Sequence, residues 1–216
     1  KNNIYSMEFE SHTSNFNILL IGPTGVGKST LINSVLQLNE NSKQYAKAAS
    51  GKPVTMGDPH PYTSDKVPGI RLWDSRGIDK SGYGINKLLN SVTKLINDAA
   101  EGNEPDKFIH CIWYCITGHR FEDIERDTLI ELMKIYHDEN LPIIIVYTQC
   151  ISENDSNSME KAIQEICMEK KRKMDIISVL AEDKFVGKKT KQQKVDKYGI
   201  DELMKKSFEK IEGSVQ

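Results

Sequence analysis

The chain has 216 residues, a length that suits one domain or one domain with an appendage. Charged residues make up 28% of it, and no apolar run approaches the ~20 residues of a spanning helix, which argues against a membrane protein. The net charge of −2 predicts no strong attraction to nucleic acid, so we expect neither a nucleic-acid partner nor a direct membrane segment.

Strand-like and helix-like segments alternate along the chain. Residues 1–14 are polar and poorly patterned, which predicts an N-terminal extension or tether, and we expect residues 15–212 to form a single domain. Apolar runs predict strands at 16–21, 62–67, 70–73, 108–116, 143–147 and 175–179. Helical spacing predicts helices at 29–38, 85–96, 122–137, 158–171 and 200–211, the fourth capped by Ser158. This alternation predicts an α/β fold with a mostly parallel sheet covered on both faces.

Cysteine usage bears on the compartment. The 4 cysteines include no C-x-x-C pair, and Cys111 and Cys115 fall in an apolar run where small buried thiols are ordinary. The start of the chain shows no signal-peptide pattern, so we expect a reducing compartment and a cytoplasmic protein. Because the chain begins at Lys1 rather than Met, we also expect a trimmed piece of a longer protein.

A glycine-rich segment lies between the first predicted strand and the first predicted helix. It reads G-x-x-x-x-G-K-[ST], and the segment comprises Gly22, Pro23, Thr24, Gly25, Val26, Gly27, Lys28, Ser29 and Thr30. Its backbone N–H groups can converge on phosphate oxygens, and the following helix adds its partial positive end. Lys28 can reach the outer phosphates, and the Ser29 hydroxyl can ligate magnesium. The strand and helix beside it distinguish the pattern from a chance glycine-rich turn.

A second motif, D-x-x-G, follows the third predicted strand and runs from Asp74 to Gly77. A carboxylate at this point can hold magnesium through water, opposite Ser29, and the Gly77 N–H can contact a terminal phosphate. Alone the motif occurs in many surface turns, but its place after a phosphate loop makes it informative. In the polar stretch between the motifs, the Thr55 hydroxyl is our candidate to complete the magnesium shell, and Thr63 is the rival.

These motifs resemble those of the TRAFAC-class, translation-factor-related GTPases, and most of all the Era-like and septin-like G domains. The resemblance covers about 15–211 and implies a Ras-like P-loop NTPase fold: three α/β/α layers around a mixed six-stranded, mostly parallel sheet with one antiparallel strand. It also implies binding of GTP or GDP with Mg²⁺, hydrolysis of GTP to GDP and phosphate, and switch segments near 45–66 and 74–83. The implied catalytic residues are Lys28, Thr55 and Gly77, and the implied metal ligands are Ser29, Thr55 and Asp74.

The guanine-reading motif of these GTPases, N/T-K-x-D, is incomplete in this chain. Thr148 fits, Gln149 replaces the lysine, and Ile151 replaces the aspartate that pairs with the guanine N–H groups. Glu153 or Asp155 in the next segment could supply a carboxylate. The resemblance assigns base contacts to Thr148, Gln149 and, from the last base-contacting loop, the backbone of Ala181.

Ile78 follows D-x-x-G where Ras-like enzymes place a water-orienting glutamine, and an alkyl side chain cannot orient water. We therefore expect a Mg-dependent GTPase switch that turns over slowly in isolation. Arg76, or His119 and Arg120, could assist within one chain or across two, as could an activating protein; a solvated arginine and a polar loop are the simpler interpretations. The alternative is a septin-like module that binds nucleotide without hydrolysis and dimerises or polymerises. A P-loop kinase or ATPase fits less well, because D-x-x-G in this place is a G-domain device.

The basic segment at 187–194 is expected to be a solvated loop, with contact to acidic lipid or a partner as the alternative. Trp73 and Trp113, in the third and fourth predicted strands, are expected in the core.

Overall fold

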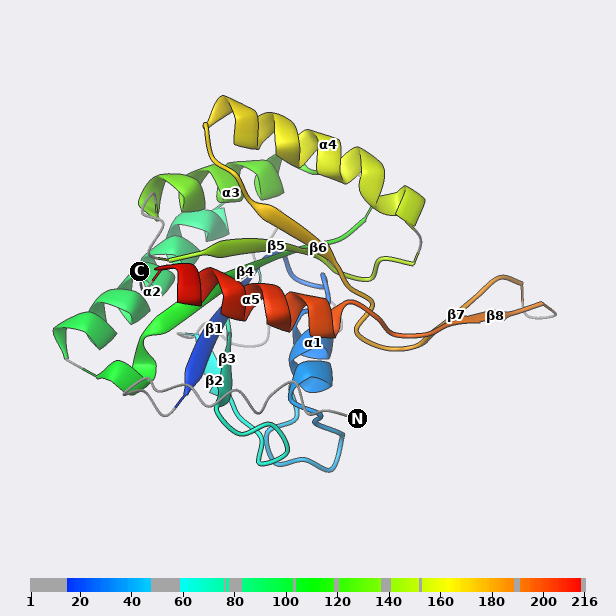
Figure 1. Ribbon diagram of the computed structural model, residues 1–216, viewed down its shortest axis with the longest axis horizontal. Coiled ribbons are helices and arrows are strands. Elements are labelled where there is room, and N and C mark those ends of the chain that lie inside the picture. The colour runs from blue at the N-terminus through cyan, green and yellow to red at the C-terminus, as the bar shows by residue number, and fades with distance from the viewer. Residues whose placement is uncertain are drawn as a thin grey trace.

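The computed structural model describes residues 15–47, 59–75, 77, 83–102, 104–118, 121–136, 141–151, 153–188 and 191–214. A six-stranded sheet forms the centre of the domain (Figure 1). Its strands are β1 (Phe16–Ile21), β2 (His60–Tyr62), β3 (Ile70–Asp74), β4 (Ile109–Ile116), β5 (Ile143–Tyr147) and β6 (Asp175–Ser178). Their order is β2-β3-β1-β4-β5-β6, and β2 is antiparallel to β3 while the other pairs are parallel. The α/β fold with one antiparallel strand is therefore confirmed.

Five helices are described: α1 (Lys28–Val35), α2 (Tyr83–Glu101), α3 (Asp123–Ile135), α4 (Glu153–Glu169) and α5 (Ile200–Ser214). A short 3₁₀ turn, η1 (Pro105–Lys107), leads into β4. Successive residues of β1 face opposite sides of the sheet: Ile18 and Leu20 pack in a cluster with α1 and α5, whereas Leu19 and Ile21 pack in a cluster with α2, α3 and α4. All residues of β1 and β5 are buried, as expected for central strands covered on both faces.

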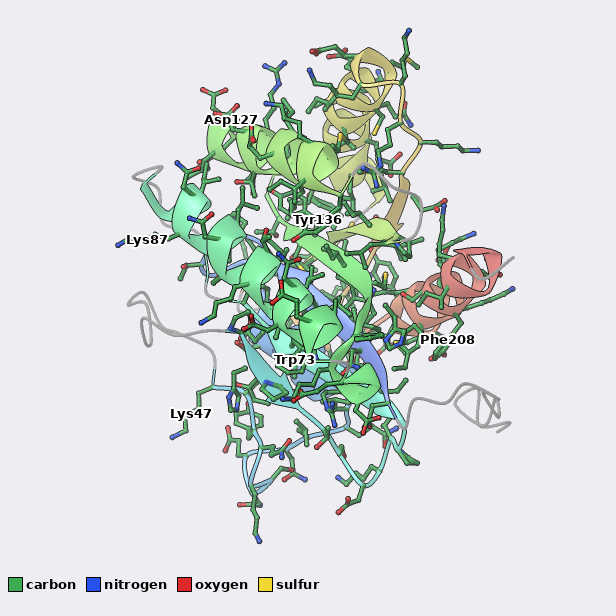
Figure 2. All side chains as sticks on the ribbon, turned by 90° about the vertical axis from the view of Figure 1, so that its left-hand side faces the viewer. Lys47, Trp73, Lys87, Asp127, Tyr136 and Phe208 are labelled. Carbon is green, nitrogen blue, oxygen red and sulfur yellow. The ribbon has the colours of Figure 1, made fainter. Side chains whose placement is uncertain are left out.

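Both tryptophans are buried, as predicted, and each indole N–H has a partner. Trp73 donates to Asn17 Oδ1 (3.0 Å), and Trp113 donates to Ser207 Oγ (2.9 Å). Asn17 is itself fully buried in β1, and its amide Nδ2 donates to the carbonyl of Asp106 (2.8 Å). Charged side chains such as Lys87 lie outside this interior and point away from it (Figure 2). The hydrogen bonds of Trp73, Trp113 and Asn17 satisfy buried polar groups whose desolvation would otherwise destabilise the fold.

Two predictions made from local pattern are wrong. The second strand is at His60–Tyr62 rather than 62–67, because pairing with β3 selects its residues. Helix α4 begins at Glu153, so Ser158 lies within it and does not cap it. The described residues of the basic segment are exposed, as expected of a solvated segment; they belong to a β-hairpin in which β7 (Lys184–Val186) is antiparallel to β8 (Gln193–Val195), and the hairpin extends away from the domain (Figure 1).

Among the helices of the described ranges, none combines the length and the apolar character that crossing a bilayer would require.

Candidate nucleotide-binding site

The phosphate loop joins the end of β1 to the start of α1. Gly27 caps the helix in a left-handed conformation (φ 97°), and its carbonyl accepts the Leu31 N–H at 2.9 Å. The first turn of α1 contains no acidic side chain, so no carboxylate of the helix itself offsets its partial positive end. An N-terminus built in this way attracts an anion such as a phosphate.

Gly22 permits a close approach between the phosphate loop and β4. A Cβ built on Gly22 would lie 2.2 Å from the carbonyl oxygen of Cys115, and the residue has φ 154°. Real Cβ atoms do not approach an oxygen so closely, so glycine is required here for steric reasons. The start of the loop is thereby fixed against the neighbouring strand.

Lys28 is folded back along the loop. Its side-chain ammonium donates to the carbonyls of Gly22 (2.9 Å) and Pro23 (3.0 Å), and the residue is only 7% exposed. Burial lowers the pKa of this ammonium group, and the nearby Asp74 carboxylate acts in the opposite direction. An ammonium group has three N–H donors, so one remains for a phosphate oxygen beyond these two bonds to the loop.

Asp74, the last residue of β3, is the carboxylate of the site. Its Oδ1 is buried and has no hydrogen-bond partner among the described residues. Burial raises the pKa of the Asp74 carboxyl, while the charges of Lys28 and His60 act to lower it. Burying a carboxylate oxygen without a partner destabilises the fold, unless a ligand binds to that oxygen. It suits Mg²⁺ or a Mg²⁺-bound water, so the donor chemistry at this position fits the metal that the motifs imply.

Gly77 lies directly against the phosphate loop. A Cβ built on it would lie 2.2 Å from Thr24 Oγ1 and 2.7 Å from the Thr24 backbone nitrogen. Ser75 fixes the same segment to the sheet, because its N–H donates to the carbonyl of Leu20 in β1 (3.1 Å). The fold therefore brings the D-x-x-G motif onto the phosphate loop, as the sequence predicts.

Thr148 and Gln149, at the end of β5, contact the opposite side of the loop. The Thr148 hydroxyl lies within hydrogen-bonding distance of the Val26 and Ile116 carbonyls, the latter at 2.9 Å. Gln149 adopts a positive φ of 55°, and its Nε2 donates to the Gly25 carbonyl at 3.1 Å. Thr148 is thus a buried brace between the strands and the loop, while Gln149 lies over the loop where the motif's lysine would stand.

Ile151 is 41% exposed and has no polar side-chain atom to offer a base. The neighbouring segments are held together by Tyr198, whose hydroxyl donates to the Cys150 carbonyl (3.0 Å). The Tyr198 backbone also pairs with Leu180 in both directions (3.0 and 3.1 Å). Tyr198 was not predicted as a site residue, because it follows the basic segment and belongs to no motif.

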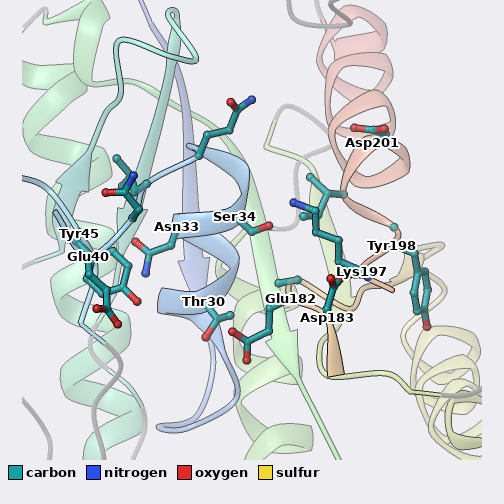
Figure 3. Close-up of a pocket in the computed structure, with 16 residues that line it drawn as sticks. Thr30, Asn33, Ser34, Glu40, Tyr45, Glu182, Asp183, Lys197, Tyr198 and Asp201 are labelled. Carbon is teal, nitrogen blue, oxygen red and sulfur yellow. Dashed lines mark hydrogen bonds between the residues drawn. The ribbon is translucent and has the colours of Figure 1, made fainter. Parts of the chain in front are cut away.

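A pocket of about 890 Å³ continues from this region along α1 (Figure 3). Thr30 of the phosphate loop and Ala181 both line it, so the two predicted nucleotide-contacting segments share one cavity. Its further walls come from the segment after α1 and from residues 197–201.

Several predicted residues lie outside the described residues: Thr55, Arg76, Ile78, His119 and Arg120. The side chains of Glu153 and Asp155 are likewise outside the description. The rival Thr63 is described, and both its N–H (2.7 Å) and its hydroxyl (3.2 Å) contact Gln44 Oε1. Thr63 therefore has a local partner away from the phosphate loop.

Comparisons with known proteins agree with this geometry. A family described as interferon-inducible GTPase (IIGP) matches residues 4–98, less than half of the chain. Mouse interferon-gamma-inducible GTPase 10 is 32% identical over 76 residues, which are 35% of this chain and 18% of that protein. The probable GTP-binding protein EngB of Thermoanaerobacter pseudethanolicus is 28% identical over 153 residues, covering 69% of this chain and 70% of EngB.

Solved structures of Toc33 share the fold. Toc33 from Arabidopsis thaliana, in complex with GDP and Mg²⁺, superposes with a TM-score of 0.62 at 17% identity, covering 92% of this chain and 85% of that one. A second structure comes from work reporting that dimerization is important for the GTPase activity of the chloroplast translocon components atToc33 and psToc159. It gives a TM-score of 0.64 at 13% identity, covering 92% and 84%.

The sheet order, the assembled motifs and these matches define the chain as a P-loop GTPase G domain. The matched stretches cover about a fifth of the length of the mouse interferon-inducible GTPases.

Proposed function

We propose that this domain binds guanine nucleotide with Mg²⁺ and hydrolyses GTP to GDP and phosphate slowly, as a nucleotide-controlled switch. The observation that carries the proposal is the buried Asp74 Oδ1, which lacks a partner among the described residues and stands beside Lys28 at the phosphate loop. Relatives named GTPases or GTP-binding proteins support the choice of nucleotide.

Each part of the site then has a distinct task. The loop N–H groups and Lys28 bind the phosphates, and the Lys28 ammonium offsets the negative charge that develops on them during transfer. Ser29, Thr55 and Asp74 would hold Mg²⁺, which supplies further charge neutralisation when bound. The Gly77 N–H would donate to the terminal phosphate, and the close approach of Gly77 to Thr24 couples this position to the shape of the loop.

The proposal is tested by calorimetric titration with GDP and GTP, followed by measurement of phosphate release at several protein concentrations. We expect binding of both nucleotides with Mg²⁺ present, and slow release that rises per molecule with concentration if a second copy assists. Absence of heat with every purine nucleotide would overturn the proposal.

A nucleotide-binding interaction module is the second candidate. Ile78 in place of the water-orienting glutamine and Ile151 in place of the base-reading aspartate favour it, since a module that holds nucleotide for shape needs no fast cycle. For the Toc proteins, dimerization is stated to matter for activity, which supports a test for a homodimer here. Nucleotide binding without phosphate release at any protein concentration would favour the module over the enzyme.

Acidification is expected to weaken the Mg²⁺-dependent part of nucleotide binding. The pKa of Asp74 is raised by burial, so this carboxyl takes up a proton at a higher pH than the ordinary aspartate value of about 3.9, and only the ionised form holds a cation well. The measurement is GDP affinity with and without Mg²⁺ as the pH is lowered from about 7.5. In Asp74→Asn the Mg²⁺ enhancement should be lost at every pH, whereas the exposed Asp65→Asn control should behave as wild type.

Restoring a carboxylate at residue 151 is expected to sharpen base preference. Ile151→Asp adds an acceptor for the guanine N–H groups, and the ratio of GDP to ADP affinity should rise by about tenfold, the value of one charge-assisted hydrogen bond. Competition against a fluorescent GDP analogue measures the ratio. Ile151→Ala is the matched control and should leave the ratio unchanged; an equal ratio in all three proteins would show that this residue does not face the base.

A further inference from the structure

The described base-side loops lack a carboxylate at the position where the motif requires one. Ile151 is apolar, and Leu180 in the facing segment is apolar and buried. The Cys150 carbonyl is already bonded to the Tyr198 hydroxyl. Guanine presents two adjacent donors, N1–H and the N2 amino group, and a site that reads them needs an acceptor nearby.

Glu182 directly follows Ala181 and provides an acceptor in the shared pocket. Its side chain is 54% exposed, so its oxygens are accessible to a ligand. Both Glu182 and Thr30 line the pocket, and Figure 3 shows their side chains extending toward the same end of it. Lys184 at the start of β7 forms an ion pair with the Glu182 carboxylate, which limits the orientations of that side chain.

The other carboxylates of the pocket are less suitable. Asp183 Oδ1 accepts the Lys197 N–H (2.8 Å) and Oδ2 pairs with Lys194 (2.8 Å), so both oxygens serve the base of the hairpin. Glu40 lies across α1 from Glu182, and Asp201 lies at the start of α5 (Figure 3). Glu182 is therefore the carboxylate placed next to both the phosphate loop and Ala181.

Tyr198 gives this arrangement a stiff frame. Its paired backbone bonds to Leu180 (3.0 and 3.1 Å) fix the segment from which Glu182 projects. Its hydroxyl fixes Cys150 (3.0 Å), beside Ile151. A backbone segment held in this way loses little conformational entropy when its residues bind a base.

We propose that Glu182 accepts the N1–H and N2–H hydrogen bonds of guanine and so replaces the missing aspartate of the base-reading motif. This inference rests on the proposed guanine-nucleotide binding and names the residue that determines its specificity.

The test compares wild type, Glu182→Gln and Glu182→Ala for binding of GDP, inosine diphosphate and xanthosine diphosphate. Inosine lacks the N2 amino group, and xanthine carries a carbonyl there, to which a glutamine amide can donate. We expect wild type to prefer GDP over inosine diphosphate. Glu182→Gln should lose about ten- to a hundredfold in GDP affinity and gain affinity for xanthosine diphosphate, while Glu182→Ala should lose discrimination among the three.

Asp183→Asn is the matched control, because it makes the same chemical change one residue away and should leave the GDP preference intact. If wild type binds GDP and inosine diphosphate equally, or if Glu182→Gln retains wild-type selectivity, the role of Glu182 is refuted while nucleotide binding stands. If wild type binds no purine nucleotide, the proposed function itself fails. Melting temperatures of all variants identify any loss of folding.

Discussion

Replacing Lys28 with alanine is expected to reduce affinity for GDP and GTP at least about a hundredfold. The ammonium group lies within the loop, and alanine removes a charge-assisted contact to the phosphates that is worth about 1.5–3 kcal/mol for each hydrogen bond. Calorimetry or displacement of a fluorescent GDP analogue measures the change.

The control for Lys28→Ala is Lys161→Ala on the exposed face of α4, which should bind as wild type. Thermal unfolding without nucleotide separates loss of binding from loss of fold. A Lys28→Ala protein that melts like wild type and still binds GDP with equal affinity would contradict the assignment of the phosphate site.

Replacing Gly22 with alanine is expected to destabilise the whole domain by about 3 kcal/mol or more. The new methyl group would meet the Cys115 carbonyl at 2.2 Å, and neither β1 nor β4 can move aside without breaking its pairing at the centre of the sheet. Chemical denaturation measures the free energy of unfolding.

Gly69→Ala is the matched control for that substitution. Gly69 also has a positive φ (81°), but a Cβ built on it meets nothing within 4 Å among the described residues. Gly69→Ala should lower the free energy of unfolding only by the strain of a left-handed backbone, about 1 kcal/mol. Equal destabilisation by the two substitutions would mean that strain, rather than the close approach to Cys115, makes Gly22 necessary.

The central strands could be predicted from sequence because their side chains are buried on both faces. The predicted bounds of the first and fifth strands coincide with β1 and β5, and β3 extends the third predicted strand by one residue, to Asp74. Prediction failed at the periphery. Pro61 interrupts the pattern of β2, and β7 and β8 have only three residues each, too few for a recognisable strand pattern, so pairing rather than composition determines these short strands.

The candidate site divides in the same way. The phosphate loop and D-x-x-G are local motifs, and their meeting follows from the rule that parallel strands present their carboxyl ends together. The base side depends on contacts that no local pattern encodes. Glu182 and Tyr198 come to the pocket through the turn after β6 and the return strand of the hairpin, which the sequence offered only as a basic loop.

The bonds from Thr148 and Gln149 to the phosphate loop span 122 and 124 positions of the chain. Residues 4–98, the stretch matched by the IIGP family, contain both phosphate-side motifs but neither β4 nor β5. A fragment of that length would leave one edge of the apolar β1 uncovered and its loop without the Thr148 and Gln149 contacts. Both motifs therefore lie in the first half of the sequence, but that half is not an autonomous folding unit, and the phosphate site is completed only when the second half of the chain has added its strands.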